Sequence, residues 1–220
     1  MAHVRENFTY EYICLTDHSQ ALNVAGGLDE GEMRKQMKKI EEVNEELGEK
    51  FIKKGIEVDI MADGTLDLSN DLLSELDWVV ASIHYKLNMD QTDRLIQACK
   101  NPFVCALGHP TGRMLNSRDP YEVDMDKVME AAKQTGTALE INAQPKRSDL
   151  NDQWAKTARE KEIPLVINTD SHYLGNLQFM KNGVYLARRA WCTKADVLNA
   201  KSWAQIDKFV KKKREKVQST

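Results

Sequence analysis

Short apolar runs alternate with longer amphipathic segments along the chain. The runs are four to seven residues long and almost continuously apolar, as in strands covered on both faces, and they span residues 10–15, 52–58, 78–83, 103–107, 138–141 and 165–168. The longer segments repeat apolar residues every three or four positions, which predicts helices over residues 28–49, 89–99, 124–134, 151–159 and 204–213. This alternation predicts an α/β fold with a parallel sheet and right-handed crossovers.

The organisation of the chain favours a single domain. No Ser-, Gly- or Pro-rich stretch divides residues 1–220, and no internal repeat is visible. The pattern of elements fits a doubly wound open sheet as well as a closed barrel, because both are built from strand–helix–strand units. The motifs at the strand ends therefore have to distinguish these two folds.

Composition narrows the class of protein further. The chain is 41% hydrophobic and 30% charged, which allows a sizeable core and excludes a disordered chain. Its 31 basic and 34 acidic residues give a formal charge of −3, so no overall positive field indicates nucleic acid or membrane. There is no apolar run near the ~20 residues of a membrane span, no apolar signal-peptide segment at the start and no Cys-x-x-Cys pair. We expect a cytoplasmic protein of enzyme size.

The one dense basic run lies in the last predicted helix, where residues 211–214 are three lysines and an arginine. A solvated helix is the simpler interpretation, and contact with nucleic acid is the alternative.

The histidines carry most of the functional information. Four of the five follow a predicted strand directly: His18, His84, His109 and His172. The carboxyl ends of parallel strands share one rim, where α/β enzymes place their active sites. Asp17 and Asp170 accompany two of these histidines, and Glu57 interrupts an apolar strand. Imidazoles and carboxylates together are ligands for Zn²⁺, Mn²⁺ or Fe²⁺, so the pattern predicts a metal site.

Each of these residues also has a structural interpretation. A single histidine at a strand end is more often a hydrogen-bonded structural residue, and Glu57 could face outward from the sheet. The joint placement of four histidines is what favours the metal site. His3 lies in a polar segment without partners and is expected to be a surface residue.

Successive motifs resemble those of the polymerase and histidinol phosphatase (PHP) superfamily. They are TDHS at residues 16–19, GIEV at 55–58, ASIH at 81–84, GHPTGR at 108–113 and NTDSH at 168–172. Residues 140–143, 147–150 and 183–191 add similarity to the PHP domain at the C-terminus of bacterial family X DNA polymerases. The resemblance implies a distorted seven-stranded (β/α) barrel with up to three metal ions on its rim. These would be Zn or Mn, with Fe or Mg as alternatives.

One expected motif is missing from the sequence. PHP domains begin with a strand that ends in His-x-His, and this chain contains no such pair. We therefore expect a barrel without its first strand and helix, with six of seven strands readable. Either the sequence is a fragment, or a neighbouring chain in an oligomer completes the barrel.

The resemblance also assigns roles to the remaining rim residues. Glu57, His84 and His109 would hold one metal, His18 and His172 a second, and Asp170 a third, with Asp17 orienting a ligand. Glu57 and Asp170 would also take part in catalysis. Independently of the resemblance, Arg113 and Arg147 are candidates for a phosphate clamp, Arg113 with a catalytic role, because a guanidinium fork matches phosphate oxygens. Each could instead be a solvated arginine or a salt-bridge partner. Asn142 would contact the substrate, with Asn168 as a weaker candidate.

The function implied is metal-dependent phosphoester hydrolysis by metal-activated water. The enzyme would be a phosphatase or a 3′–5′ exonuclease, acting on single-stranded DNA 3′ ends or on a small phosphate ester, without a membrane partner. The alternative is an inactive PHP module that binds metal or scaffolds a DNA polymerase. An amidohydrolase is a third possibility, but no lysine lies at a convincing strand end.

Overall fold

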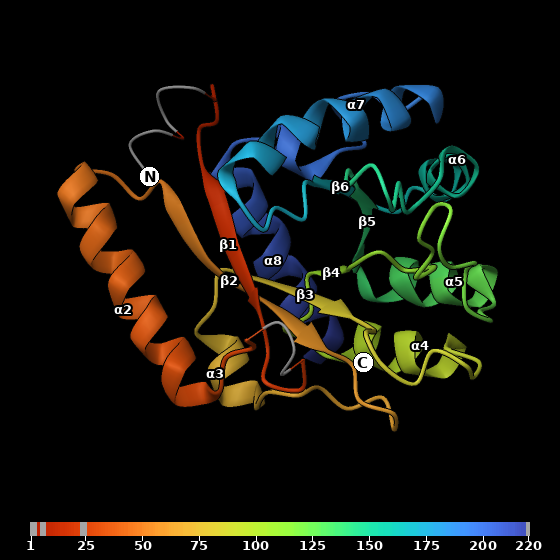
Figure 1. Ribbon diagram of the computed structural model, residues 1–220, viewed down its shortest axis with the longest axis horizontal. Helices are drawn as coiled ribbons and strands as arrows, with labels where there is room; N and C mark the ends of the chain where they lie inside the picture. The colour runs from red at the N-terminus through yellow and green to blue at the C-terminus, as the bar shows by residue number, and fades with distance from the viewer. Residues whose placement is uncertain (1–3, 5–7, 23–25, 219–220) are drawn as a thin grey trace.

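The computed structural model describes residue 4 and residues 8–22 and 26–218, so His3 lies outside the described residues. Its centre is one parallel sheet of six strands in the order β1-β2-β3-β4-β5-β6 (Figure 1). The strands are β1 (Ile13–His18), β2 (Ile52–Asp59), β3 (Trp78–Ser82), β4 (Ala106–Leu107), β5 (Ala138–Asn142) and β6 (Leu165–Asn168). A doubly wound sheet needs a reversal of strand order, so this sequential order excludes it and is that of a barrel.

The helices lie between and after the strands, and all of them except α8 cover the outer face of the sheet. They are α2 (Glu30–Leu47), α3 (Asn70–Ser74), α4 (Thr92–Lys100), α5 (Met125–Thr135), α6 (Asp152–Glu160), α7 (Met180–Arg189) and α8 (Trp203–Gln218), with 3₁₀ turns η2 (Leu174–Phe179) and η3 (Leu198–Ala200). Five lie where the hydrophobic pattern predicts them. The short α3 and α7 were not predicted. The apolar run 103–107 forms a strand only at its last two residues.

The sheet separates two apolar cores. Outward-facing strand residues such as Ile56, Ala81 and Ile141 pack under the helices in the larger core. Inward-facing residues such as Val80, Ala106 and Val166 form a smaller core inside the curve of the sheet. Successive side chains of a strand point to opposite faces of the sheet, so neighbouring residues of one strand lie in different cores.

Two glycines allow the strands to curl tightly around the inner core. A Cβ at Gly55 would lie 2.5 Å from Cys14 Sγ, and one at Gly108 would lie 2.2 Å from Ser82 Oγ. Both separations are far below normal van der Waals contact, so only glycine fits at these two inner positions.

Helix α8 closes the amino-terminal end of the sheet and explains the basic run. Lys213 is only 2% exposed and donates hydrogen bonds to the carbonyls of Cys99 and Asn101 at the end of α4. Arg214 donates to the carbonyls of Ser74 and Leu76 after α3, and Lys216 donates to Lys133 O in the last turn of α5. These cations meet helix C-termini, whose carbonyls carry partial negative charge. The expectation of a fully solvated basic helix is therefore wrong.

The two ends of the sheet are linked by side chains. Tyr10 and Tyr12, before and at the start of β1, donate to Leu177 O (3.1 Å) and Lys201 O (2.9 Å) near the segments that follow β6. In the part of the chain that the structure describes, β1 and β6 do not pair, so the sheet is a partial barrel of six strands and a seventh is not seen. None of the helices in the described ranges is long and apolar enough to cross a membrane.

Candidate active site

Strand alternation decides which rim side chains face the inside of the sheet. The register pairs His18 with Glu57, so both side chains leave the sheet on the same, inner face. Asp17, one residue earlier, is exposed, and its carboxylate accepts a hydrogen bond from Gln36 on α2. The expectation that Asp17 orients a ligand is therefore wrong, because neighbours in a strand face opposite sides of the sheet.

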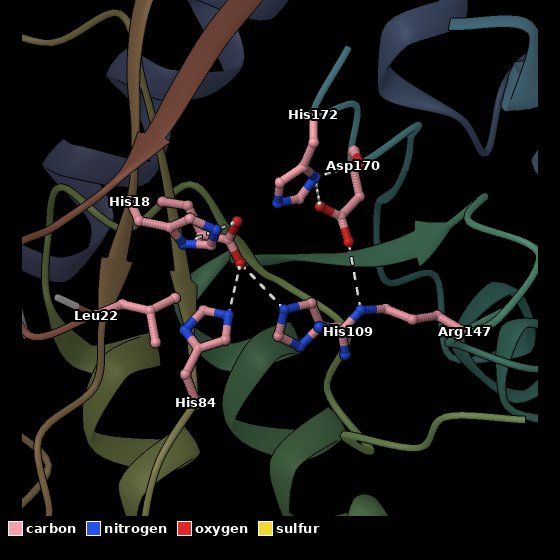
Figure 2. Close-up of a pocket in the computed structure, with 8 residues that line it drawn as sticks. His18, Leu22, His84, His109, Arg147, Asp170 and His172 are labelled. Carbon is pink, nitrogen blue, oxygen red and sulfur yellow. Dashed lines mark hydrogen bonds and ion pairs between the residues drawn. The ribbon is translucent and has the colours of Figure 1, made fainter. Parts of the chain in front are cut away.

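Figure 2 shows the rings of His18, His84 and His109 gathered in the pocket, and the carboxylate of Glu57 lies among them. Its Oε1 is 3.0 Å from His109 Nε2 and 3.4 Å from His84 Nε2, and its Oε2 is 3.7 Å from His18 Nδ1. The ring centroids of His18 and His84 are 5.0 Å apart, and those of His84 and His109 are 5.1 Å apart. Four predicted site residues therefore lie together: His18 on β1, Glu57 on β2, and His84 and His109 in the segments after β3 and β4.

The charges in this cluster are strongly coupled. Burial would raise the pKa of Glu57, but the hydrogen bond with His109 and the nearby His84 imidazole outweigh it and hold the pKa well below its usual range. Burial would lower the pKa of His84, but Asp59 and Glu57 raise it to about 9. For His18, burial prevails and lowers the pKa. The cluster therefore favours an ionised carboxylate that faces positive charge.

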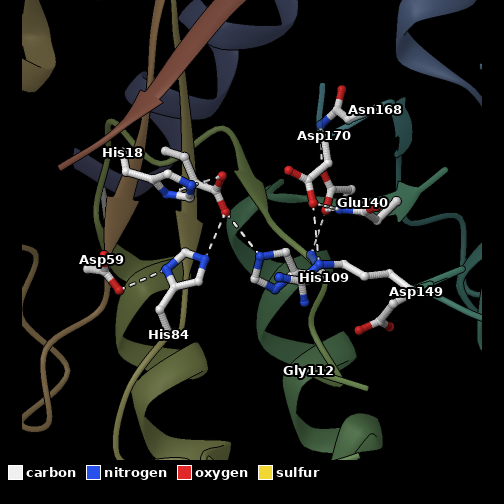
Figure 3. Close-up of polar contacts among 12 residues, drawn as sticks. His18, Asp59, His84, His109, Gly112, Glu140, Asp149, Asn168 and Asp170 are labelled. Atoms are coloured by element: carbon white, nitrogen blue, oxygen red, sulfur yellow. Dashed lines mark hydrogen bonds and ion pairs between the residues drawn. The ribbon is translucent and has the colours of Figure 1, made fainter. Parts of the chain in front are cut away.

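Asp59 is a buried carboxylate that the sequence analysis did not identify. Its Oδ1 lies 3.0 Å from His84 Nδ1 (Figure 3). Its own backbone N–H donates to Ser19 Oγ. This contact fixes the His84 ring so that Nε2 faces Glu57, as carboxylates behind metal-binding histidines do. The spacing Glu57-x-Asp59 places both carboxylates on one strand face, a signal that was available in the sequence.

Glu140 is a second carboxylate that was not predicted, although its motif was noticed. It is 4% exposed, and its Oε2 accepts a 2.6 Å hydrogen bond from the backbone N–H of His109. Oε1 accepts from Asn168 Nδ2 at 2.7 Å. Burial, with the negative charges of Glu57 and Asp170, raises the pKa of Glu140 to about 8. This contact holds the backbone at His109, where φ is 28°, so that the chain turns at the end of β4 and the imidazole faces Glu57.

The opposite wall of the site comes from the ends of β5 and β6. Asp170 Oδ2 lies 3.3 Å from Arg147 Nε and 3.1 Å from Asn142 Nδ2. His172 Nδ1 lies 3.6 Å from Asp170 Oδ1, and the His172 side chain is 61% exposed. Its ring centroid is 5.9 Å from that of His18, so the two walls meet at this pair.

Arg113 does not join this group. Its Nε donates to the Arg147 carbonyl at 3.1 Å, and another guanidinium nitrogen donates to the Ser148 carbonyl. The structure therefore gives no support to Arg113 as a phosphate clamp; its guanidinium holds the backbone of the loop that carries Arg147. Asn168, the weaker candidate, is bonded to Glu140 and does not line the pocket.

These walls enclose a cavity of about 180 Å³. It is lined by His18, Leu22, Glu57, His84, His109, Arg147, Asp170 and His172. Seven of these eight residues are polar or charged, so the cavity suits a small charged group. Among the described residues, Arg147 Nη1 is buried without a hydrogen-bond partner.

The donor set suits a divalent metal ion. Ligand atoms of His18, Glu57 and His84 all lie within 4.8 Å of one another. Two ligand atoms about 2.1 Å from one tetrahedral ion are about 3.4 Å apart, and the Glu57–imidazole separations of 3.0, 3.4 and 3.7 Å bracket that value. His18 Nδ1 and His84 Nε2 are also buried without a hydrogen-bond partner in the part of the chain described. Imidazole nitrogens and a carboxylate are ligands for Zn²⁺ and related ions.

Comparison with known proteins gives the family. No model of a known protein family matches the chain. The chain is 44% identical over 206 residues to the DNA polymerase/3′-5′ exonuclease PolX of Bacillus subtilis strain 168, which covers 92% of this chain but only 36% of that protein. It is 32% identical over 220 residues to a probable phosphatase of Thermoanaerobacter sp. strain X514, covering 84% of that protein. A probable phosphatase of Caldanaerobacter subterraneus is 28% identical over 222 residues. With this similarity, the sequential parallel sheet and the histidines on its rim, the chain belongs to the PHP superfamily.

Proposed function

We propose that the protein is a metal-dependent phosphoesterase. The observation that carries the proposal is the placement of Glu57 among three imidazoles on one side of the cavity, with Arg147 and Asp170 on the other. The first side can hold metal ions; on the other, Arg147 can hold an anion and Asp170 can add a metal ligand. A phosphate ester needs both.

Glu57, His18, His84 and His109 would hold metal, and Asp170 and His172 would add ligands from the opposite wall. Bound divalent ions supply positive charge for the phosphoryl oxygens and acidify water at neutral pH. Zn or Mn is the ion that imidazole and carboxylate ligands favour, with Fe and Mg as alternatives. Asp59 keeps His84 Nε2 directed at the site through the 3.0 Å contact to Nδ1.

Arg147 is the residue that would bind the phosphate. Its Nε faces Asp170, and its buried Nη1 makes no hydrogen bond among the described residues, so this nitrogen still has its donor to give. A guanidinium presents its donors in a planar fork that matches phosphate oxygens. Asn142 would orient Asp170 through the 3.1 Å contact, and Arg113 would hold the backbone of the Arg147 loop.

The relatives indicate two kinds of phosphoester substrate. One is named for a 3′-5′ exonuclease activity and others are named probable phosphatases. We propose the same choice here: a single-stranded DNA 3′ end or a small phosphate ester. Because the chain spans 36% of the Bacillus relative, that protein's polymerase activity is not part of this proposal. A cytoplasmic location and an oligomer that completes the barrel stay predictions.

The test is hydrolysis of a generic phosphate ester by purified protein with added Mn²⁺ or Zn²⁺, with metal content measured in parallel. Wild-type protein should hydrolyse the ester, whereas the rate of hydrolysis should fall by at least about a hundredfold in Glu57→Gln and in His84→Ala. Lys212→Gln, at an exposed position in α8, is the control and should match wild type.

The absence of a His-x-His pair from the sequence favours a second candidate, a metal-binding PHP module without activity. Metal bound at one ion or more per chain, with no turnover of any phosphoester, would support the module and refute the enzyme.

A further inference from the structure

The cavity is small, so we expect it to take the phosphoryl end of a substrate. At about 180 Å³ it is smaller than the ~300–1,000 Å³ of sites that enclose a whole drug-sized ligand. A phosphoryl group and its ions would fill most of this space. The organic part of the ester must therefore rest on the rim, and the side chains there decide which organic group is preferred.

One exposed aromatic residue lies next to the site in the sequence. Tyr173 directly follows His172, which lines the cavity, and Tyr173 is 69% exposed. A tyrosine that is neither packed in a core nor hydrogen-bonded through its hydroxyl leaves most of a flat apolar face in solvent. The neighbouring Leu174 is also half exposed, so this part of the rim is apolar.

The backbone that carries Tyr173 is held in place. Asn176 is 3% exposed; its side-chain oxygen accepts from the His172 N–H at 3.2 Å, and its own N–H donates to Tyr173 O at 2.9 Å. The Tyr173 ring lies beside Gly175, where a Cβ would be 3.4 Å from the ring carbon Cε2. The turn thus supports one side of an aromatic ring and leaves the rest of it exposed, which lowers the entropy lost when a ligand stacks on the ring.

We propose that Tyr173 is a specificity-determining residue that stacks on a nucleobase attached to the phosphoester in the cavity. Bases stack on aromatic side chains with little dependence on sequence, by about five- to a hundredfold in affinity per base. The inference rests on the proposed function and adds the organic group that the site prefers. Two substrates share this chemistry: the terminal nucleotide of a single strand and a free nucleotide.

The experiment compares substrates that differ only by the base. One pair is a ten-nucleotide oligothymidylate with a normal or an abasic 3′-terminal residue; the other pair is thymidine 5′-monophosphate and deoxyribose 5-phosphate. Wild-type kcat/KM should favour the base-bearing member of one pair by about tenfold, and Tyr173→Leu should reduce that ratio to about one. Tyr173→Phe keeps the aromatic face and should keep the ratio. The pair that shows the effect identifies the source of the base.

Tyr185→Leu is the matched control, because Tyr185 is another exposed tyrosine, on α7, and no residue next to it in the sequence lines the cavity. It should leave the ratio as in wild type. A ratio near one in the wild-type protein, or one that is unchanged in Tyr173→Leu, would overturn the inference.

A binding measurement separates this inference from the proposed function. Stacking quenches the fluorescence of 2-aminopurine, so an oligonucleotide with 2-aminopurine at its 3′ end should be quenched by wild type and by Tyr173→Phe but not by Tyr173→Leu. If no substrate is hydrolysed, the proposed function fails while quenching still decides the role of Tyr173. Equal quenching by wild type and Tyr173→Leu would refute that role.

Discussion

Gly183 offers a test of how tightly helix α7 packs on the sheet. It is buried in the middle of α7, where glycine is the least favourable residue except proline. A Cβ at this position would lie 2.3 Å from Ile167 Cγ2 and 3.0 Å from Ala143 Cβ. Both neighbours are almost fully buried, at 4% and 2% exposed. The helix therefore touches the ends of β5 and β6 through its backbone.

Two effects of opposite sign act in Gly183→Ala. Alanine would stabilise the helix by about 1 kcal/mol relative to glycine. Normal carbon–carbon contact is about 3.5–4.0 Å, so the new methyl would overlap Ile167 by more than an ångström, and overpacking of this degree costs about 3 kcal/mol. The steric effect is larger. We expect a net loss of about 2 kcal/mol, or about 5 °C in Tm for a chain of this size.

Thermal and urea unfolding of four variants would measure this balance. Gly31→Ala is the matched control, because Gly31 is exposed in the first turn of α2 and the nearest atom to its Cβ would be Asp29 Oδ1 at 3.3 Å. It should be neutral or stabilising by up to about 1 kcal/mol. Ile167→Leu removes the Cγ2 methyl, so combining it with Gly183→Ala should recover about 1 kcal/mol beyond additivity. A Gly183→Ala protein as stable as wild type or more so would refute the packing argument.

Three further predictions concern buried polar groups. Asp59→Asn should weaken Zn²⁺ or Mn²⁺ binding by about 10- to 100-fold in calorimetric titration, because the carboxylate that orients His84 is lost; unchanged affinity would contradict this role. Arg214→Gln should cost about 1–2 kcal/mol in urea unfolding, because the carbonyls of Ser74 and Leu76 lose a charged donor, whereas Lys212→Gln should stay within about 0.5 kcal/mol; equal effects would argue against capping by Arg214. Burial lowers the pKa of Lys213 from its ordinary 10.5 to about 8, so between these values the unfolded chain binds the extra proton and stability rises with pH. The stability of wild type relative to Lys213→Met should then increase by at most about 1.4 kcal/mol per pH unit from pH 8 to 10 and stay level below pH 8; a difference that is flat across this range would show that burial does not suppress the charge.

Much of the fold and most of the candidate site could be predicted, because local patterns carry them. Continuous apolar runs mark buried parallel strands, and the strand-end rule identified His18, His84, His109 and His172 as rim residues. All four histidines line one cavity together with Glu57. The family resemblance, which the comparisons confirm, supplied the barrel type that periodicity alone left open.

What could not be predicted depends on contacts between distant segments. Helix α7 was not predicted because Gly183 lowers the helix propensity of this segment. The reason for a glycine there is the close contact between the α7 backbone and Ile167, which the sequence does not reveal. The basic run was expected in solvent because its acceptors are helix ends more than 80 residues away in sequence. Asp17 and Asp59 differ: strict alternation along β1 and β2 places one outside and one inside, so a closer use of strand periodicity would have assigned both.

The position of α8 in the chain has a consequence for folding order. Ile206 and Val210 of α8 pack against the inner core. Its polar contacts join residues 112 and 138 positions apart. Non-local contacts of this kind form late, because a long loop must close before they are made. During synthesis the concave apolar surface should therefore stay open until α8 has left the ribosome. Pulse-labelling hydrogen exchange during refolding should show amides of α8 protected last; early protection there would reverse this order.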